Sequence, residues 1–291
     1  MIEPETQLEE GLRYQKLGML HKALEHYEAT ADSSADPAVV GEAYRREAHV
    51  YRAWCRWDEA IDAARRSATL ARTNNLQDLY GEALNAEAIV HQERGDFDRA
   101  LALYERILGS KVGDRLRGIA LQNMGSLAAQ RADLDAAEKY FRQSFRYFRR
   151  AGYAWGEAFA LNNQSAVALD SGRFKLAEVL GGQALTAASK IGDQELMGIA
   201  ELNTAEALAG QRELERAEAH AHDALGHFGP DGKELRLAQC YRVLGDVRTM
   251  RGEQRHAFDA YTRALGLAEA AGAHREVSRI RDCMQLLNVA E

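Results

Sequence analysis

The chain has 291 residues, a formal net charge of −7 and three cysteines. The acidic balance argues against nonspecific binding to nucleic acid, which depends on a basic surface that neutralises phosphates. Cys55, Cys240 and Cys283 are too few and too scattered for a disulfide framework or a metal site, and we expect Cys240 and Cys283 to be small buried hydrophobes. The acidic first ten residues do not resemble a secretory signal, and no stretch approaches the length of an apolar membrane span. We therefore expect a cytoplasmic protein.

One unit recurs seven times along the chain, and an alanine marks each copy. The markers are Ala23, Ala60, Ala100, Ala137, Ala177, Ala217 and Ala257, separated by 37 or 40 residues. A small residue stands twelve residues before every marker, and a large apolar residue stands three before it in six copies. A period in this range predicts a solenoid of helix pairs, in which each repeat packs only against its neighbours.

The copies divide the chain into repeats. Their approximate ranges are 5–36, 37–75, 76–112, 113–152, 153–192, 193–230 and 231–271. Inside the repeats a turn is expected at Gly18, Gly95, Ala132, Gly172 and Gly252, where a left-handed residue fits most easily; Cys55 and Arg212 depart from this pattern. We predict an all-α fold, a right-handed α-solenoid of seven helix pairs, as a single domain over residues 1–291.

A last helix is expected at 274–289. Val277, Ile280, Met284 and Leu287 form one apolar stripe there, so the helix should cap the open end of the solenoid. No equivalent helix precedes the first repeat, which makes the amino-terminal face a candidate for self-association. The alternative is that Glu3, Glu5, Glu9 and Glu10 simply solubilise this end.

The stretches QERGDFDRALALYERIL (92–108) and QRADLDAAEKYFRQSF (130–145) resemble the tetratricopeptide repeat, and the resemblance covers about residues 5–271. Units of 37 to 40 residues are longer than the ordinary 34. They look like the long repeats of kinesin light chains, spindle-orientation adaptors and the sensor arms of bacterial transcription activators. The resemblance implies a scaffold or adaptor, without cofactor or enzymatic activity, that binds a peptide segment of a partner protein in its concave groove.

A second function stays open. The chain could be a ligand- or peptide-sensing regulator that changes its superhelical conformation to control a separate effector. Bacterial regulators of that kind carry an additional amino-terminal domain, whereas the first repeat begins here near residue 5. The adaptor is therefore the favoured interpretation.

Amide side chains recur on the first helices, which line the concave wall in this family. Asn123, Asn163 and Asn203 lie fourteen residues before their markers, and Asn85, Gln122 and Asn162 lie fifteen before theirs. A carboxamide donates and accepts at once, so it can hold the backbone of an extended peptide, the role that the resemblance implies for Asn123, Asn163 and Asn203. The alternative is that the amides solvate the groove or bridge adjacent helices.

Charged residues flank this band. Arg45, Arg46, His49 and Arg52 share one face of a helix in the second repeat and could hold a carboxylate or phosphate, unless Glu42 and Glu47 pair with these arginines. At the far end, Glu206, Arg242 and Asp246 are expected to form a mixed surface.

The remaining motifs are less specific. Arg142, Arg146, Arg149 and Arg150 could form a basic patch for an acidic partner, but Glu138, one turn before Arg142, is expected to pair with it. His220, His222 and His227 lack the spacing and further ligands of a metal site. No phosphate-binding loop or nucleophile elbow occurs. We expect a protein or peptide as partner, and neither nucleic acid nor a membrane.

Overall fold

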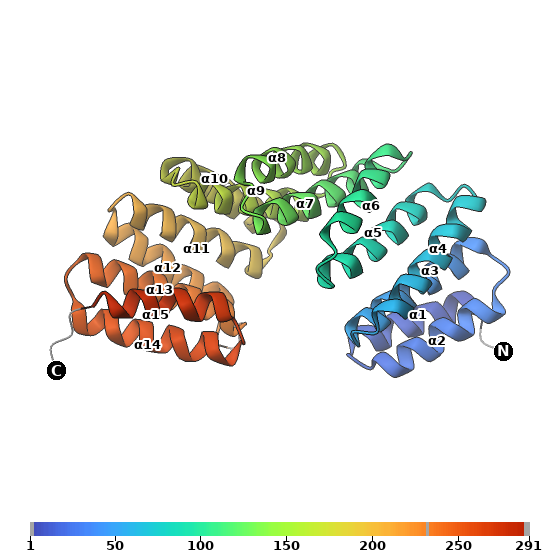
Figure 1. Cartoon of the computed structure of the whole chain (residues 1–291), viewed down its shortest axis with the longest axis horizontal. Coiled ribbons are helices and arrows are strands. Elements are labelled where there is room, and N and C mark those ends of the chain that lie inside the picture. Colours follow the sequence, from blue (N-terminus) through green and yellow to red (C-terminus); the bar gives the residue numbers. More distant parts are fainter. Residues whose placement is uncertain (1–2, 231–232, 288–291) are drawn as a thin grey trace. The chain divides into compact units, whose positions relative to one another are not determined.

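The computed structural model describes residues 3–230 and 233–287, and these residues form fifteen helices and no strand. The bounds are α1 (Pro4–Lys16), α2 (Leu20–Ser33), α3 (Pro37–Ala53), α4 (Trp57–Thr73), α5 (Gln77–Glu93), α6 (Phe97–Gly109), α7 (Asp114–Gln130), α8 (Leu134–Arg150), α9 (Ala154–Asp170), α10 (Phe174–Ile191), α11 (Gln194–Gly210), α12 (Leu214–Phe228), α13 (Glu234–Met250), α14 (Gln254–Ala270) and α15 (His274–Gln285) (Figure 1). The all-α prediction is confirmed. The start of the seventh expected repeat, 231–232, and the end of the expected cap, 288–289, lie outside the described residues.

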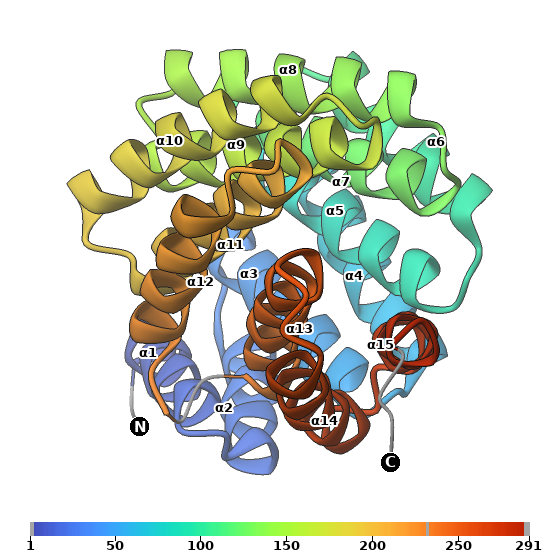
Figure 2. The ribbon, with the colours of Figure 1, turned by 90° about the vertical axis from the view of Figure 1, so that its left-hand side faces the viewer.

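The chain divides into two compact units, Met1–Leu127 and Ala128–Glu291, with the division inside α7. First helices contact the next first helix in the pairs α1 and α3, α3 and α5, α9 and α11, and α11 and α13. Second helices pack against first helices that are their neighbours in sequence, as the pair α13 and α14 illustrates (Figures 1 and 2). These contacts are those of an α-solenoid. The prediction of one uninterrupted domain stays a prediction.

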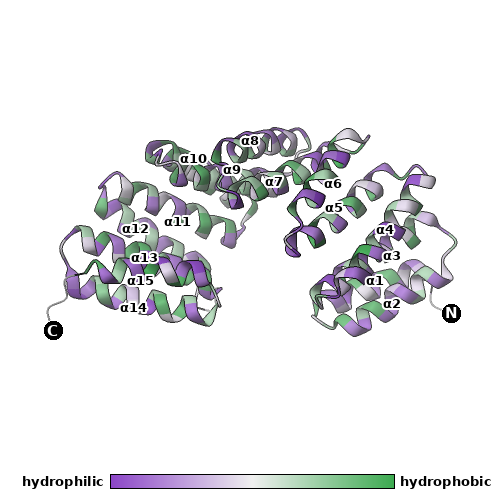
Figure 3. Cartoon of the chain, viewed as in Figure 1, coloured by the Kyte–Doolittle hydropathy of each residue, from purple (hydrophilic) through white to green (hydrophobic). Residues whose placement is uncertain are grey.

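Each helix buries one side. Hydrophilic and hydrophobic segments alternate along the ribbons in Figure 3, as expected for amphipathic helices. The marker alanines Ala23, Ala60 and Ala257 are completely buried, as are the other four. Large rings fill the spaces beside small residues, since a Cβ atom added to Gly245 would lie 2.5 Å from the Tyr261 ring. This close approach explains why a helix keeps a glycine that costs it about 1 kcal/mol in propensity.

The helix α15 packs against α14 and α13, in the place that a further first helix would take. Ile280 and Leu287 are buried in one cluster with Tyr261, and Val277 and Met284 pack against it. The predicted capping helix is therefore confirmed from His274 to Gln285, whereas the described residues 286–287, which were expected to belong to it, are not helical. Within that part of the chain, none of the helices combines the length and the apolar character needed to cross a membrane.

The turns inside the repeats adopt the left-handed conformation, as predicted. Gly252 has φ of 80°, and the two exceptions follow it, with φ of 56° at Cys55 and 65° at Arg212. A residue with a Cβ atom adopts this region at a cost of about 1–2 kcal/mol. The repeat geometry therefore outweighs the local preference of Cys55 and Arg212.

A reciprocal pair of substitutions tests this strain. We expect Arg212→Gly to raise the free energy of unfolding by about 0.5–1 kcal/mol, because it removes the left-handed penalty. The substitution Gly252→Ala should lower it by about 1 kcal/mol, since no atom lies within 4 Å of the added Cβ and only the backbone resists it. Urea unfolding followed by circular dichroism measures both changes in the free energy of unfolding. If both substitutions changed it in the same direction, the explanation would be contradicted.

Candidate functional site

The candidate site lies on the row of first helices, and its six amides do not share one environment. Gln122 is 4% exposed and Asn162 is 1% exposed, so neither lies on an open wall. Asn162 Nδ2 donates to the carbonyl oxygen of Leu196 on α11, 3.1 Å away. A step of one residue turns a side chain by about 100° around a helix, and here it turns the Asn162 amide toward α11. Both amides are covered in this structure, and a groove role for Gln122 and Asn162 stays a prediction.

The amides one residue further along the chain are half-buried. In unit 1, Asn123 Nδ2 donates to Oδ1 of the half-buried Asn85, 3.0 Å away, and links α7 to α5. In unit 2, Asn203 Nδ2 donates to the carbonyl oxygen of Asn162, 3.1 Å away, and links α11 to α9. The alternative that these amides bridge adjacent helices is confirmed for Asn85, Asn123 and Asn203. Peptide binding stays a prediction.

Asn163 stands at the same position of the repeat as Asn123 and Asn203, but it does not bridge helices through its Nδ2. Its Nδ2 atom is buried, and no acceptor among the described residues lies within hydrogen-bond distance. A buried donor without a partner costs about 1–3 kcal/mol. No hydrogen bond from Nδ2 therefore fixes the orientation of this amide.

The predicted basic cluster on α3 is neutralised by carboxylates. Arg45 forms a forked contact with Glu42, with N–O distances of 2.7 and 2.5 Å, and its Nε lies 3.4 Å from Glu82. Arg46 Nε donates to the same Glu42 at 2.7 Å. Burial alone would raise the pKa of Glu42, but the hydrogen bonds and charges of Arg45 and Arg46 hold that pKa below its ordinary value. The alternative pairing is thus confirmed for Glu42.

The other members of the cluster are equally engaged. Arg52 Nη1 donates to Glu93 on α5 at 2.6 Å. His49 Nε2 lies 3.4 Å from Arg45, and burial together with the nearby arginines lowers the pKa of His49 to about 4. Glu47 does not pair with these arginines: it is 3% exposed and lies 3.8 Å from Arg66 of α4. Anion binding by Arg45, Arg46, His49 and Arg52 stays a prediction, and an anion would compete there with the carboxylates of Glu42 and Glu93.

Glu82 and Glu93 were not identified from the sequence as the acidic partners of Arg45 and Arg52. Glu82 stands 37 residues after Arg45, and Glu93 stands 41 after Arg52. These separations are close to one repeat, so the register of the repeats carried a signal for both pairs. Two of the acids that pair with the cluster, Glu42 and Glu82, also border a hollow of about 640 Å³.

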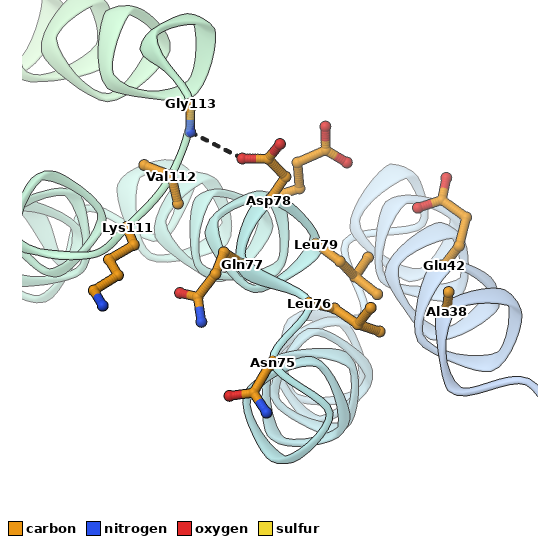
Figure 4. Close-up of a pocket in the computed structure, with 11 residues that line it drawn as sticks. Ala38, Glu42, Asn75, Leu76, Gln77, Asp78, Leu79, Lys111, Val112 and Gly113 are labelled. Atoms are coloured by element: carbon orange, nitrogen blue, oxygen red, sulfur yellow. Dashed lines mark hydrogen bonds between the residues drawn. The ribbon is translucent and has the colours of Figure 1, made fainter.

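The hollow lies between the first turns of α3 and α5 and the connection from α6 to α7 (Figure 4). Glu42, Asp78 and Glu82 line it together with Lys111. The Asp78 carboxylate accepts a hydrogen bond from the amide of Gly113 at 2.9 Å, as the dashed line in Figure 4 shows. The surface beside Arg45 is therefore mixed in charge.

The expected mixed surface in unit 2 is an enclosed ion-pair network. Arg242 is 1% exposed, and it donates to Glu276 at 2.7 Å, to Asp246 at 2.8 Å and to Glu206. These contacts join α11, α13 and α15. Burial raises the pKa of Asp246, although Arg242 opposes this shift. The prediction of a mixed surface is wrong for Arg242, because this side chain is buried between α11, α13 and α15.

The three histidines of α12 do not gather at one place. In the described part of the chain, the group able to hold a metal ion is Glu201, His220 and Asp223, without His222 or His227. Nδ1 of His220 lies 2.5 Å from Glu201, and this hydrogen bond raises the pKa of His220. The pair is already satisfied, so this geometry does not call for a metal.

Comparison with known proteins finds similarity in structure. No protein-family model and no curated protein matches the sequence. A signal transduction ATPase with numerous domains from Pyrococcus horikoshii, a protein with a tetratricopeptide repeat sensor, has a TM-score of 0.77 at 15% identity, over 95% of this chain and 44% of that one. This chain thus spans less than half of that protein.

Two further structures cover both chains more evenly. A tetratricopeptide repeat protein from Parabacteroides merdae has a TM-score of 0.62 at 17% identity, with 98% of each chain covered. The apo form of the quorum sensor NprR from B. thuringiensis has a TM-score of 0.67 at 16% identity, over 90% of this chain and 75% of that one. At these identities the likeness establishes the fold.

Proposed function

From the tetratricopeptide-repeat fold of this chain we infer that it binds a peptide segment of a partner protein along its first helices. The observation that carries the proposal is the unsatisfied amide of Asn163. Asn163 and Asn203 occupy the same position in consecutive repeats, on α9 and α11, which contact each other. A peptide lying across these two helices would meet one amide from each.

The chemistry of an extended peptide fits these side chains. A peptide backbone presents carbonyl oxygens and amide hydrogens, and a carboxamide can bond to both. Rotation of the Asn163 side chain would bring its Nδ2 to a peptide carbonyl, and the bond formed would recover part of the desolvation cost. Asn203 would contribute its Oδ1, because its Nδ2 donates to Asn162.

A sensing function is the second candidate. It is supported by two structural neighbours, one described as a signal transduction ATPase with a tetratricopeptide repeat sensor and the other as a quorum sensor. In this alternative the same amides hold the ligand, and binding changes the conformation of the repeats. Small-angle scattering with and without a bound peptide separates the candidates, since a passive adaptor should give the same curve in both states.

The test of the amide site uses peptides selected from a random 12-residue phage library against the whole chain. We expect Asn163→Ala/Asn203→Ala to weaken binding of a selected peptide by about tenfold to thirtyfold, since each net hydrogen bond contributes about 1 kcal/mol. Fluorescence anisotropy measures the dissociation constant. Asn123→Ala is measured as a separate variant of unit 1.

Stability provides the control for this test. Asn163→Ala alone should leave the melting temperature unchanged or raise it, because it removes a buried donor without a partner. Gln183→Ala/Gln285→Ala removes two exposed amides outside the site and should not alter peptide affinity. If the double asparagine variant binds as tightly as the parent protein, the peptide does not use these amides.

A further inference from the structure

The exposed side of α8 carries a row of positive charges. Lys139, Arg142, Arg146 and Arg149 follow one another at spacings of three, four and three residues, and all four are exposed. This spacing puts them on one face of the helix. The ten residue steps from first to last correspond to about 15 Å at a rise of 1.5 Å per residue. These four residues are named the α8 basic face.

The carboxylate expected to neutralise this face is engaged elsewhere. Glu138 stands one turn before Arg142, which predicts an ion pair, but the structure contradicts it. Glu138 accepts a hydrogen bond from Arg173 Nη2 at 2.8 Å, because Arg173 lies at the start of the next second helix and reaches across. In the part of the chain that the structure describes, no carboxylate lies within 4.0 Å of a charged nitrogen of the α8 basic face.

The other second helices of unit 2 do not repeat this arrangement. The exposed side of α12 carries the acidic residues Glu215 and Asp223, with Ala219 between them. On α10, exposed Lys175 is followed by Leu176 and Val179, which are 39% and 56% exposed. On α14, exposed Arg255 is followed one turn later by the exposed acidic residue Asp259 and then by Thr262. Among the described second helices of unit 2, a row of four exposed positive charges is therefore found on α8, in a chain whose net charge is −7.

We propose that the α8 basic face docks an acidic segment of a partner protein. Four guanidinium and ammonium groups over about 15 Å match a short segment with carboxylates on one helical face or along one extended stretch. Half-buried aromatic rings lie beside the charges: Phe145 packs against Leu161 and Ala184, and Tyr147 lies under Arg150, 4.5 Å from the ring centre to the guanidinium carbon. A protein segment can contact both the charges and the rings.

The limited size of the face favours a protein over longer polyanions. Nucleic acids and anionic membranes bind through many phosphates over an extended surface. Here the exposed carboxylates of α12 belong to the same unit, and the acidic net charge of the chain repels a long polyanion. The proposal does not depend on the amide site, because α8 is a second helix and the amides lie on first helices.

The experiment uses a synthetic 15-residue peptide with glutamates at spacings of three, four and three residues, and a matched peptide with glutamine at the same places. We expect the glutamate peptide to bind the whole chain with an affinity that falls as salt rises, and the glutamine peptide to bind at least tenfold more weakly. Fluorescence anisotropy at low and physiological ionic strength measures both. Equal affinity for the two peptides would overturn the proposal.

A pair of charge-matched variants locates the binding. Arg146→Glu/Arg149→Glu should weaken binding of the glutamate peptide about tenfold or more, because it adds repulsion to lost contacts. Arg72→Glu/Arg255→Glu changes the net charge equally at two isolated exposed positions and should have little effect. Equal losses in both variants would show attraction by net charge alone and would overturn the assignment to α8. So would α8-dependent binding of a 20-base-pair duplex or phosphatidylserine vesicles without binding of the peptide.

Discussion

Replacing Arg242 with methionine is expected to lower the free energy of unfolding by about 3 kcal/mol, because three carboxylates then lose the cation that they share. Methionine keeps much of the volume, so the loss should come from the carboxylates of Asp246 and Glu276 and from Glu206, which keeps only a 4.0 Å contact with Arg279. Glu276 is itself 9% exposed. Chemical denaturation measures the total loss, and hydrogen exchange should show faster exchange in α15, which Arg242 ties to α13.

Two further variants make this expectation specific. Arg242→Met/Glu276→Gln should recover part of the lost stability, since it removes one of the unpaired carboxylates. Arg281→Met breaks an exposed ion pair with Glu269 and should cost less than about 1 kcal/mol. A loss at Arg242 no larger than the loss at Arg281 would mean that the enclosed network adds little to the stability of the cap.

Replacing Glu47 with glutamine is expected to stabilise the protein above neutral pH. Burial, with nearby acidic residues, raises the pKa of Glu47 to about 7 despite the opposing charge of Arg66. Because the folded pKa is higher than the unfolded one, ionisation costs folding free energy as the pH rises from about 4.5 to about 7, and the cost persists above that range. At about 1.4 kcal/mol per pKa unit, the glutamine variant should gain up to about 3 kcal/mol at pH 8.

The pH profile separates this effect from a change in packing. The stabilities of the parent protein and Glu47→Gln should converge near pH 4, where the glutamate is protonated in both states. Glu9→Gln removes the same charge from an exposed place on α1 and should change stability by less than about 0.5 kcal/mol at any pH. A constant difference between Glu47→Gln and the parent across this range would rule out titration of Glu47 as the cause.

The sequence predicted the repeated framework because its determinants recur every 37 to 40 residues. The marker alanines, the turns and the apolar stripe of the cap each need a particular side-chain size or backbone conformation. Each of these requirements can be recognised from the residue type at a single position of the sequence. Even Cys55 and Arg212, which break the pattern in type, keep its left-handed conformation. The spacing of these residues along the chain was therefore enough to place the helix pairs.

The site was less predictable because it depends on angles around a helix and on pairs between repeats. Asn162 and Asn163 are adjacent in sequence, yet one is buried with its Nδ2 bonded to Leu196 and the other is half-buried with no acceptor for its Nδ2. Glu138 could reach two arginines, and the choice of Arg173 over Arg142 depends on side-chain conformations that no spacing specifies. Composition and periodicity predict which residue types lie near each other but not which atoms meet.

The contacts of the second helices have a consequence for how such a chain can diversify. Within each unit these helices pack on neighbouring first helices, and one second helix meets the next through side chains, as in the ion pair of Glu178 on α10 with Arg216 on α12 at 2.8 Å. A substitution on the outer side of a second helix, away from such side chains, therefore alters a single repeat. These outer positions can be varied independently, in nature or in a combinatorial library, while the packed first helices of each unit keep the scaffold constant.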